Sequence, residues 1–163
     1  MSYARAHHNY PAADIFADRG CAFVAPTDGR VAEVSRVDHW RSASSPGAAR
    51  GGRSVSIVGV DGVQYYGSHL EAVAEVIRSG TPVREGQVLG RVGDSGSAHG
   101  TGTHLHFGIS WPTAPERWWV RRGTVAPQRF LDAWRAGEDL SPAATVRKAK
   151  ARAGDDSRCR TYC

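Results

Sequence analysis

The sequence predicts a mainly β fold with an antiparallel sheet built from hairpins, long loops around a cleft and one short C-terminal helix. Two Asp-Gly pairs, Asp28-Gly29 and Asp61-Gly62, are flanked by strand-like runs, a strong signal for a tight hairpin turn. The chain also has 19 glycines, which suit many turns between short strands. Its 163 residues, 40% of them hydrophobic, are enough to bury one sizeable core.

The strands are expected on both sides of these turns. Residues 23–25 and 30–37 flank the first Asp-Gly pair, and residues 55–60 and 63–66 flank the second. Each pair of runs is expected to form an antiparallel hairpin, because a two-residue turn reverses the chain direction.

The segments outside the hairpins carry different signals. Residues 41–53 are rich in Ser, Gly, Ala and Arg, which predicts a mobile loop that could wall one end of a cleft. Residues 70–77 have apolar residues at helix-like spacing and are expected to form a helical turn. Residues 127–136 are expected to form a short amphipathic helix packed on the core.

The composition changes near residue 141, so residues 1–140 are expected to form one domain and residues 141–163 a basic tail. The tail contains six basic residues, two aspartates and hardly any apolar anchors. Such a segment cannot offset the entropy of its own ordering, which predicts disorder.

The chain is basic, with a formal net charge of +5 and a pI of about 9.5, which favours polyanionic surroundings. Nucleic acid would be one such partner. The arginines are scattered through the first 140 residues, however, and no nucleic-acid-binding motif accompanies them, so no nucleic-acid partner is expected.

The segment His104-Leu105-His106-Phe107 contains two histidines separated by one apolar residue, in a run typical of a β-strand. Alternation along a strand places both imidazoles on the same face. Such a face can hold a metal ion beside a second, free imidazole.

Further potential metal ligands occur on other segments. His7, His8 and Asp14 lie in a short segment near the N-terminus, and His69 ends a strand-like run in the middle of the chain. A hydrolytic zinc site takes three ligands of the His or Asp/Glu type and keeps a fourth position for water. The inventory of the chain matches that requirement.

These segments occur in an order that resembles the lysostaphin/LytM-type zinc metallopeptidases, which cut peptide bonds in bacterial peptidoglycan. The resemblance spans roughly residues 5–112. It rests on His8 and Asp14, then Tyr66-Gly67-Ser68-His69-Leu70, then the H-x-H segment, with residues 24–31 and 86–93 between them. It implies a zinc endopeptidase acting on peptidoglycan peptide stems or cross-bridges, with anionic wall polymers as possible further partners.

The resemblance also implies roles for five residues. His8, Asp14 and His106 would bind one Zn²⁺, and His69 and His104 would be unligated histidines that assist catalysis. One feature departs from the family. The usual H-x-x-x-D spacing would put the first ligand at Tyr10, so the motif with His8 is two residues longer, and His7 is a possible substitute.

Two alternative functions are open. The first is a non-catalytic module of the same fold, in which the ligands are lost and the groove binds cell wall or activates another hydrolase. All five positions carry competent residues, which favours the enzyme. The second is a biotinyl or lipoyl carrier, which residues 83–93 also resemble. A carrier needs a hairpin lysine, and the only lysines, Lys148 and Lys150, lie in the tail.

The sequence shows no membrane or targeting segment. No run of 18 apolar residues is present, and residues 1–16 lack the charged and apolar regions of a signal peptide. An extracellular or wall-associated location is implied by the resemblance alone. The three cysteines show no metal-binding spacing and leave the disulfide state open.

Overall fold

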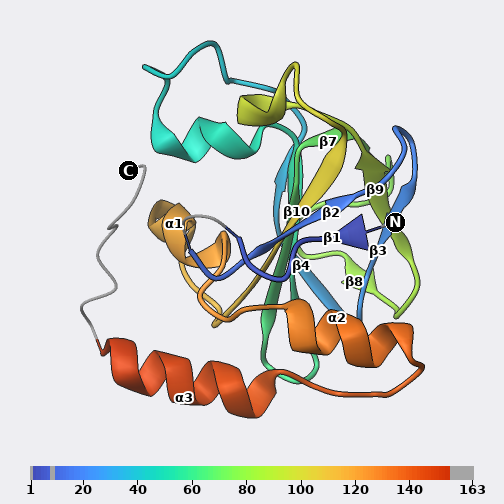
Figure 1. Ribbon diagram of the computed structural model, residues 1–163, viewed down its shortest axis with the longest axis vertical. Helices are drawn as coiled ribbons and strands as arrows, with labels where there is room; N and C mark the ends of the chain where they lie inside the picture. Colours follow the sequence, from blue (N-terminus) through green and yellow to red (C-terminus); the bar gives the residue numbers. More distant parts are fainter. Residues whose placement is uncertain (1, 8–9, 155–163) are drawn as a thin grey trace.

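The computed structural model describes residues 2–7 and 10–154 and is dominated by two antiparallel sheets (Figure 1). The larger sheet contains, in spatial order, β1 (Ser2–Tyr3), β2 (Ala13–Phe16), β10 (His104–Ser110), β6 (Gln64–Ser68), β5 (Ser54–Gly59), β4 (Gly29–Ser35) and β8 (Pro82–Val83). The smaller sheet contains β3 (Ala22–Val24), β9 (Val88–Val92) and β7 (Leu70–Val73). The expected mainly β, antiparallel fold is confirmed.

Short helical elements connect and cover the sheets. Three are 3₁₀ turns: η1 (Gly47–Gly51), η2 (Gly96–Ala98) and η3 (Pro115–Arg117). The α-helices are α1 (Trp118–Arg121), α2 (Gln128–Arg135) and α3 (Ala143–Ala153). Helix α2 confirms the expected C-terminal helix. Within the described part of the chain, no helix has the length and apolar character needed to cross a membrane.

The second predicted hairpin is present, and the first is not. Strands β5 and β6 pair across Asp61-Gly62, with Ile57 opposite Tyr65. Strand β3, in contrast, pairs with β9 and not with β4. The backbone N–H of Ala25 donates to Gln87 at 2.9 Å, so the chain beyond β3 stays attached to the smaller sheet before it crosses to the larger one.

Residues 70–77 form strand β7 and a turn, which corrects the expectation of a helical turn. Strand β7 pairs with β9, and the turn closes with a bond from the Ile77 N–H to the Ala74 carbonyl. The guanidinium of Arg36 donates to the carbonyls of Val73, Ala74 and Ile77. These bonds satisfy backbone groups that a helix would have satisfied internally.

The two faces of β10 have different surroundings. Leu105, Phe107 and Ile109 are buried in the hydrophobic core, where the Phe107 ring lies against Trp134 of α2. The intervening residues, which include His104 and His106, project to the opposite face. Strand β10 therefore contributes both to the core and to the candidate site, and its pairing with β2 on one side and β6 on the other holds it in place (Figure 1).

Helix α3 corrects the expectation that the chain is disordered from residue 141. Val146 is 3% exposed and belongs to the core, with Ala143, Ala149 and Ala153 partly buried against it. Small apolar residues at spacings of three and four form a narrow stripe that the overall basic composition conceals. Residues 155–163 of the expected tail lie outside the described residues, and the division at residue 140 stays a prediction.

Truncating Val146 is expected to destabilise the fold. Val146→Ala removes two buried methyl groups, and we expect the free energy of unfolding to fall by about 1–3 kcal/mol, the range for small core truncations. Urea unfolding measures the change. Lys148→Ala, on an exposed position of the same helix, is the matched control and is expected to stay within about 0.5 kcal/mol of wild type. Equal stability of both variants would show that α3 does not pack on the core.

The N-terminal segment is tied to α2 by an exposed polar cluster. The Tyr3 hydroxyl donates to Asp132 at 2.6 Å, and the Arg5 guanidinium makes two bonds to the same carboxylate at 2.9 and 2.7 Å. The bonds from Arg5 and Tyr3 lower the pKa of Asp132 from 3.8 to about 2. The carboxylate therefore contributes stability above its unfolded pKa, and that contribution is lost as the pH falls toward 2.

This cluster gives a pH-dependent prediction. Asp132→Asn should lower the melting temperature slightly at pH 7, because exposed ion pairs contribute little. The difference in melting temperature between Asp132→Asn and wild type should become smaller as the pH is lowered from 5 to 3, because the wild-type protein then loses the contribution of the ionised carboxylate. Thermal unfolding followed by circular dichroism across this range checks both statements, and a difference that grows toward low pH would contradict the assignment.

Candidate metal centre and active-site cleft

The register between β2 and β10 creates the centre of the site. His106 lies directly opposite Asp14, and His104 lies opposite Phe16. Directly opposed residues in an antiparallel pair project to the same face, so the Asp14 carboxylate meets the His106 imidazole. The distance from His106 Nδ1 to Asp14 Oδ1 is 2.9 Å.

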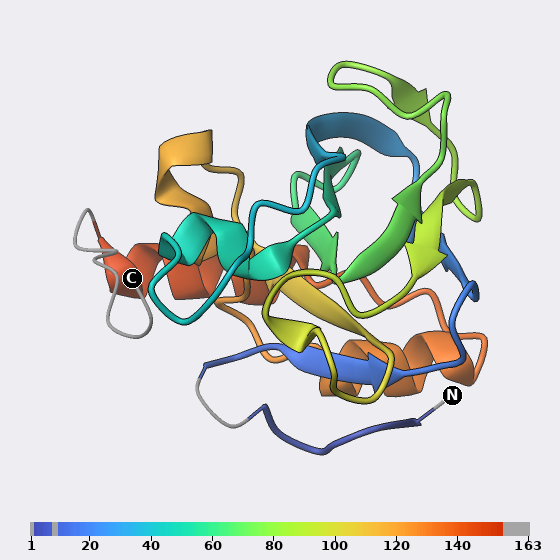
Figure 2. The same ribbon diagram turned by 90° about the horizontal axis from the view of Figure 1, so that it is seen from above.

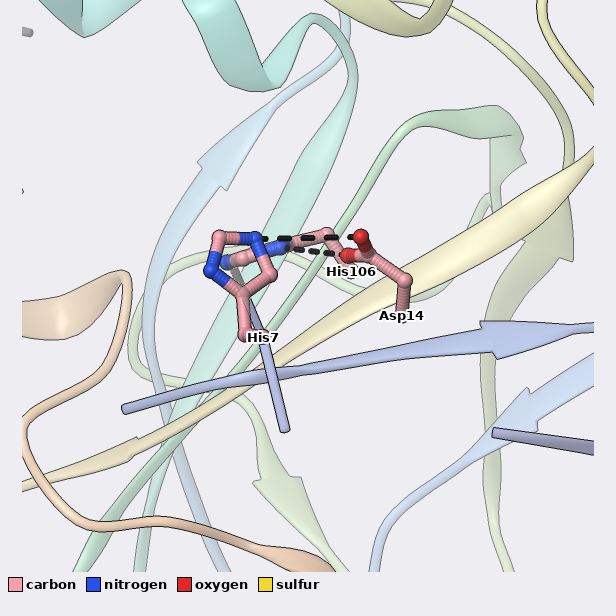
Figure 3. A group of neighbouring side chains, drawn as sticks. All are labelled: His7, Asp14 and His106. Carbon is pink, nitrogen blue, oxygen red and sulfur yellow. Dashed lines mark hydrogen bonds and ion pairs between the residues drawn. The ribbon is translucent and has the colours of Figure 1, made fainter. Parts of the chain in front are cut away.

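His7 completes a group of three potential ligands. Its Nε2 lies 3.7 Å from Asp14 Oδ2, and the ligand atoms of His7, Asp14 and His106 all lie within 4.8 Å of one another. Figure 3 shows both imidazoles directed at the carboxylate. His8, the ligand expected from the resemblance, is outside the described residues. The structure thus brings together Asp14, His106 and the substitute that the sequence left open.

The tautomer of His106 is set by its other ring nitrogen. His106 Nε2 lies 2.9 Å from the carbonyl oxygen of Arg122, which can only accept, so Nε2 carries the proton. The lone pair is then on Nδ1 and faces Asp14. Two acceptors at 2.9 Å need a proton or a cation between them. A hydrogen bond to the far nitrogen is also the usual way in which a protein orients a metal-ligating histidine.

The close approach of the Arg122 carbonyl requires Gly108. A Cβ atom at position 108 would lie 2.5 Å from the Arg122 oxygen and 2.6 Å from the Arg121 oxygen. Any larger residue would displace the segment after α1 from β10. Gly108 follows His106 by two residues on the same strand, so one short stretch supplies both a potential ligand and the space for the carbonyl to which it donates.

The donor set fits a zinc ion. Burial raises the pKa of Asp14, but the contact with His106 and the nearby imidazoles of His7 and His104 outweigh it and lower this pKa to about 2. The carboxylate is therefore ionised at neutral pH. Two imidazoles and one carboxylate are the ligand types of a catalytic zinc site with an open fourth position.

Tyr10 stands where the H-x-x-x-D spacing would place a ligand. Its hydroxyl lies 3.3 Å from His106 Nε2, and its ring centroid is 4.5 Å from that of His7. Burial raises the pKa of Tyr10 to about 12, so the phenol is protonated at neutral pH. A neutral phenol is a poor zinc ligand, which is consistent with His7 in the third position.

His69 sits at the point where the chain passes from one sheet to the other. It links β6 to β7 with a φ of 63°, the one positive value outside glycine in the described chain. Its Nδ1 donates to the Ser95 carbonyl at 2.7 Å, which leaves the lone pair on Nε2. Burial, aided by His106 and His104, lowers the pKa of His69 to about 3. A strained, neutral histidine is typical of a functional site.

His104 has the same arrangement as His69. Its Nδ1 donates to the Gly102 carbonyl at 2.7 Å, so its Nε2 also carries a lone pair. The ring centroids of His69 and His104 are 5.0 Å apart, and His104 Nε2 is 3.9 Å from Asp14 Oδ1. The structure therefore places both predicted unligated histidines beside the metal-ligand group.

All of these side chains line one cleft of about 370 Å³. Tyr66 is buried and does not line the cleft, although its ring centroid lies 6.4 Å from that of His106, and Tyr65 is in the core. Sequence reasoning missed two arginines that also line the cleft, Arg50 and Arg122. Arg122 lies outside every motif of the sequence. Its backbone carbonyl accepts a hydrogen bond from His106, and any residue type could supply that carbonyl.

Comparison with known proteins finds solved structures that share the fold of this chain. In the solved structures, the catalytic domain of lysostaphin from Staphylococcus simulans matches with 19% identity and a TM-score of 0.57, over 81% of this chain and 90% of that one. Whole lysostaphin matches with 20% identity and a TM-score of 0.61, over 86% and 54%. A putative M23 peptidase from Pseudomonas aeruginosa matches with 23% identity and a TM-score of 0.56, over 77% and 44%.

At these identities, the structural matches establish the fold, and the chain spans about half the length of the two longer proteins. The comparison with curated protein sequences finds no match. The profile of peptidase family M23 matches residues 8–117, which is more than half of the chain. The chain therefore belongs to peptidase family M23.

Proposed function

We propose that this protein is a zinc-dependent endopeptidase that hydrolyses peptide bonds in bacterial peptidoglycan. The observation that carries the proposal is the joint placement of two groups in one cleft. His7, Asp14 and His106 form a potential metal site, and His69 and His104 present unprotonated Nε2 atoms beside it. This is the inventory that metal-assisted amide hydrolysis requires.

In the proposed site, His7, Asp14 and His106 hold one Zn²⁺. A zinc ion supplies a Lewis acid that polarises the scissile carbonyl and brings the pKa of a coordinated water to about 7. His7 takes the place that the resemblance gives to His8, because its Nε2 already lies beside Asp14.

His69 and His104 perform the proton transfers. Each holds its Nδ1 proton on a backbone carbonyl, so each can accept a proton at Nε2 and later donate it to the leaving amine. The imidazole that does not act as base can stabilise the negative charge that develops on the carbonyl oxygen. The low pKa of His69 means that its Nε2 is unprotonated at neutral pH before the substrate binds.

The competing function is a binding-only module of the same fold. The positions of His69 and His104 argue against it, because a groove that only binds needs neither a strained residue nor two oriented imidazoles. The substrates proposed are peptide stems or cross-bridges, and the basic charge of the chain favours additional contact with anionic wall polymers. Both partners imply action outside the cytoplasmic membrane, as a secreted or wall-associated protein.

Digestion of purified peptidoglycan tests the proposal. The protein is expected to release soluble fragments with new amino termini, to lose this activity in a chelator, and to recover it when zinc is added back. Liquid chromatography with mass spectrometry identifies the bond that is cut. Absence of new amino termini from every wall type tested, with zinc bound, would support the binding-only module.

A further inference from the structure

Two arginines line the cleft beside the proposed metal ligands. Arg50 belongs to η1 and Arg122 directly follows α1. These two elements contact each other, and Figure 2 shows them adjacent. The two side chains therefore enter the cleft from neighbouring segments.

The charge in the cleft is unbalanced. Among its lining residues, the carboxylate is that of Asp14, which already faces three imidazoles. In the described part of the chain, Arg122 makes no ion pair, whereas its neighbour Arg121 pairs with Glu33 at 2.7 Å. A cationic group without a carboxylate, next to the scissile position, attracts an anionic ligand.

The guanidinium of Arg122 is held by two aromatic rings. Its guanidinium carbon lies 4.9 Å from the centroid of the Tyr10 ring and 5.6 Å from that of Trp118. Arg50 lies over Trp40 in the same way, at 5.1 Å. Stacking on an aromatic ring uses the face of a guanidinium, and the N–H edge of Arg122 can also bind a planar anion.

We infer that Arg122, with Arg50, binds a free carboxylate on the substrate, on a residue next to the scissile amide. The inference rests on the proposed peptidase function and specifies its substrate class. A carboxylate matches the guanidinium fork, and its binding fixes the peptide relative to His69 and His104. Cross-links whose flanking residues carry a free carboxyl group are then substrates, and neutral glycine-rich bridges are not.

The test uses synthetic cross-linked stem-peptide dimers in two forms, with the carboxyl group next to the cross-link amide either free or converted to a carboxamide. The zinc-loaded protein is expected to cut the free form with a kcat/KM about 10- to 100-fold higher, because charged hydrogen bonds are lost in the amide. Arg122→Gln and Arg50→Gln should each reduce this preference, chiefly through KM. Arg122→Lys should restore only part of it, since a lysine lacks the fork.

Arg129→Gln is the matched control, because Arg129 also lies over an aromatic ring, at 5.5 Å from Phe130, but does not line the cleft. It should keep the full preference. The Arg122 backbone carbonyl is present in every variant, so zinc content should not change. Equal cleavage of both dimers by the wild-type protein overturns the inference and leaves the peptidase function intact. Cleavage confined to glycine-rich walls also overturns the inference and leaves the peptidase function intact. If no wall and no dimer is cleaved, both the inference and the proposed peptidase function are overturned.

Discussion

Replacing His106 with alanine is expected to abolish both zinc binding and peptidoglycan hydrolysis. His106 is 3% exposed, its Nε2 donates to the Arg122 carbonyl, and its Nδ1 faces Asp14, so its removal takes one of the three potential ligands out of the group. Wild-type protein purified without chelator should hold about one zinc per chain. The variant should hold none above background. Mass spectrometry of the metal content and release of new amino termini measure the two effects.

His39→Ala is the control for this experiment, because His39 is an exposed histidine outside the cleft. It should keep both zinc and activity. Circular dichroism of His106→Ala must show a folded protein for the loss to count. Full zinc occupancy in folded His106→Ala would remove this residue from the ligand set.

The same measurement separates His7 from His8. His7→Ala should lose zinc, since the His7 Nε2 faces Asp14 Oδ2. His8→Ala should keep its zinc, because His7 is the proposed ligand. The opposite result would restore the ligand set that the resemblance implies.

The central geometry of the site could be predicted from the sequence because it depends on strand alternation. The H-x-H spacing fixed two imidazoles on one face, and the observed register then brought Asp14 opposite His106. The third ligand could not be placed. His7 and His8 are adjacent in the sequence, and no periodic pattern in this segment predicts which side chain turns toward the sheet.

The errors in the fold arise where long-range pairing overrides local signals. Asp28-Gly29 has the composition of a hairpin turn, but β3 gains its partners from β9, more than sixty positions later in the chain. Residues 70–73 have helix-like apolar spacing and nevertheless pair with the same strand. An Asp-Gly pair indicates that the chain can turn at that point. It does not identify which strand pairs with the residues on either side.

The error in α3 has a different cause. Composition predicted disorder from residue 141, although one valine and several alanines were enough to anchor a helix. Average hydrophobicity does not reveal that these residues share one face of the helix. The Arg122 carbonyl could not be predicted for a similar reason, because backbone groups are the same in every residue.

The final prediction separates catalysis from metal binding. His69→Ala and His104→Ala leave His7, Asp14 and His106 in place, so both variants should bind about one zinc per chain. Each variant loses a group that transfers a proton or stabilises the developing oxyanion. Turnover is therefore expected to fall by about 10²- to 10⁴-fold.

The positive φ of His69 needs its own control. Alanine is strained at a φ of 63°, so His69→Ala also tests the turn between the two sheets. Asparagine tolerates this conformation, and His69→Asn should therefore fold and bind zinc as wild type does while turnover stays low. If His69→Asn or His104→Ala hydrolyses peptidoglycan at nearly the wild-type rate, that histidine has a structural role. The remaining histidine would then have to both accept the proton from water and deliver it to the leaving amine.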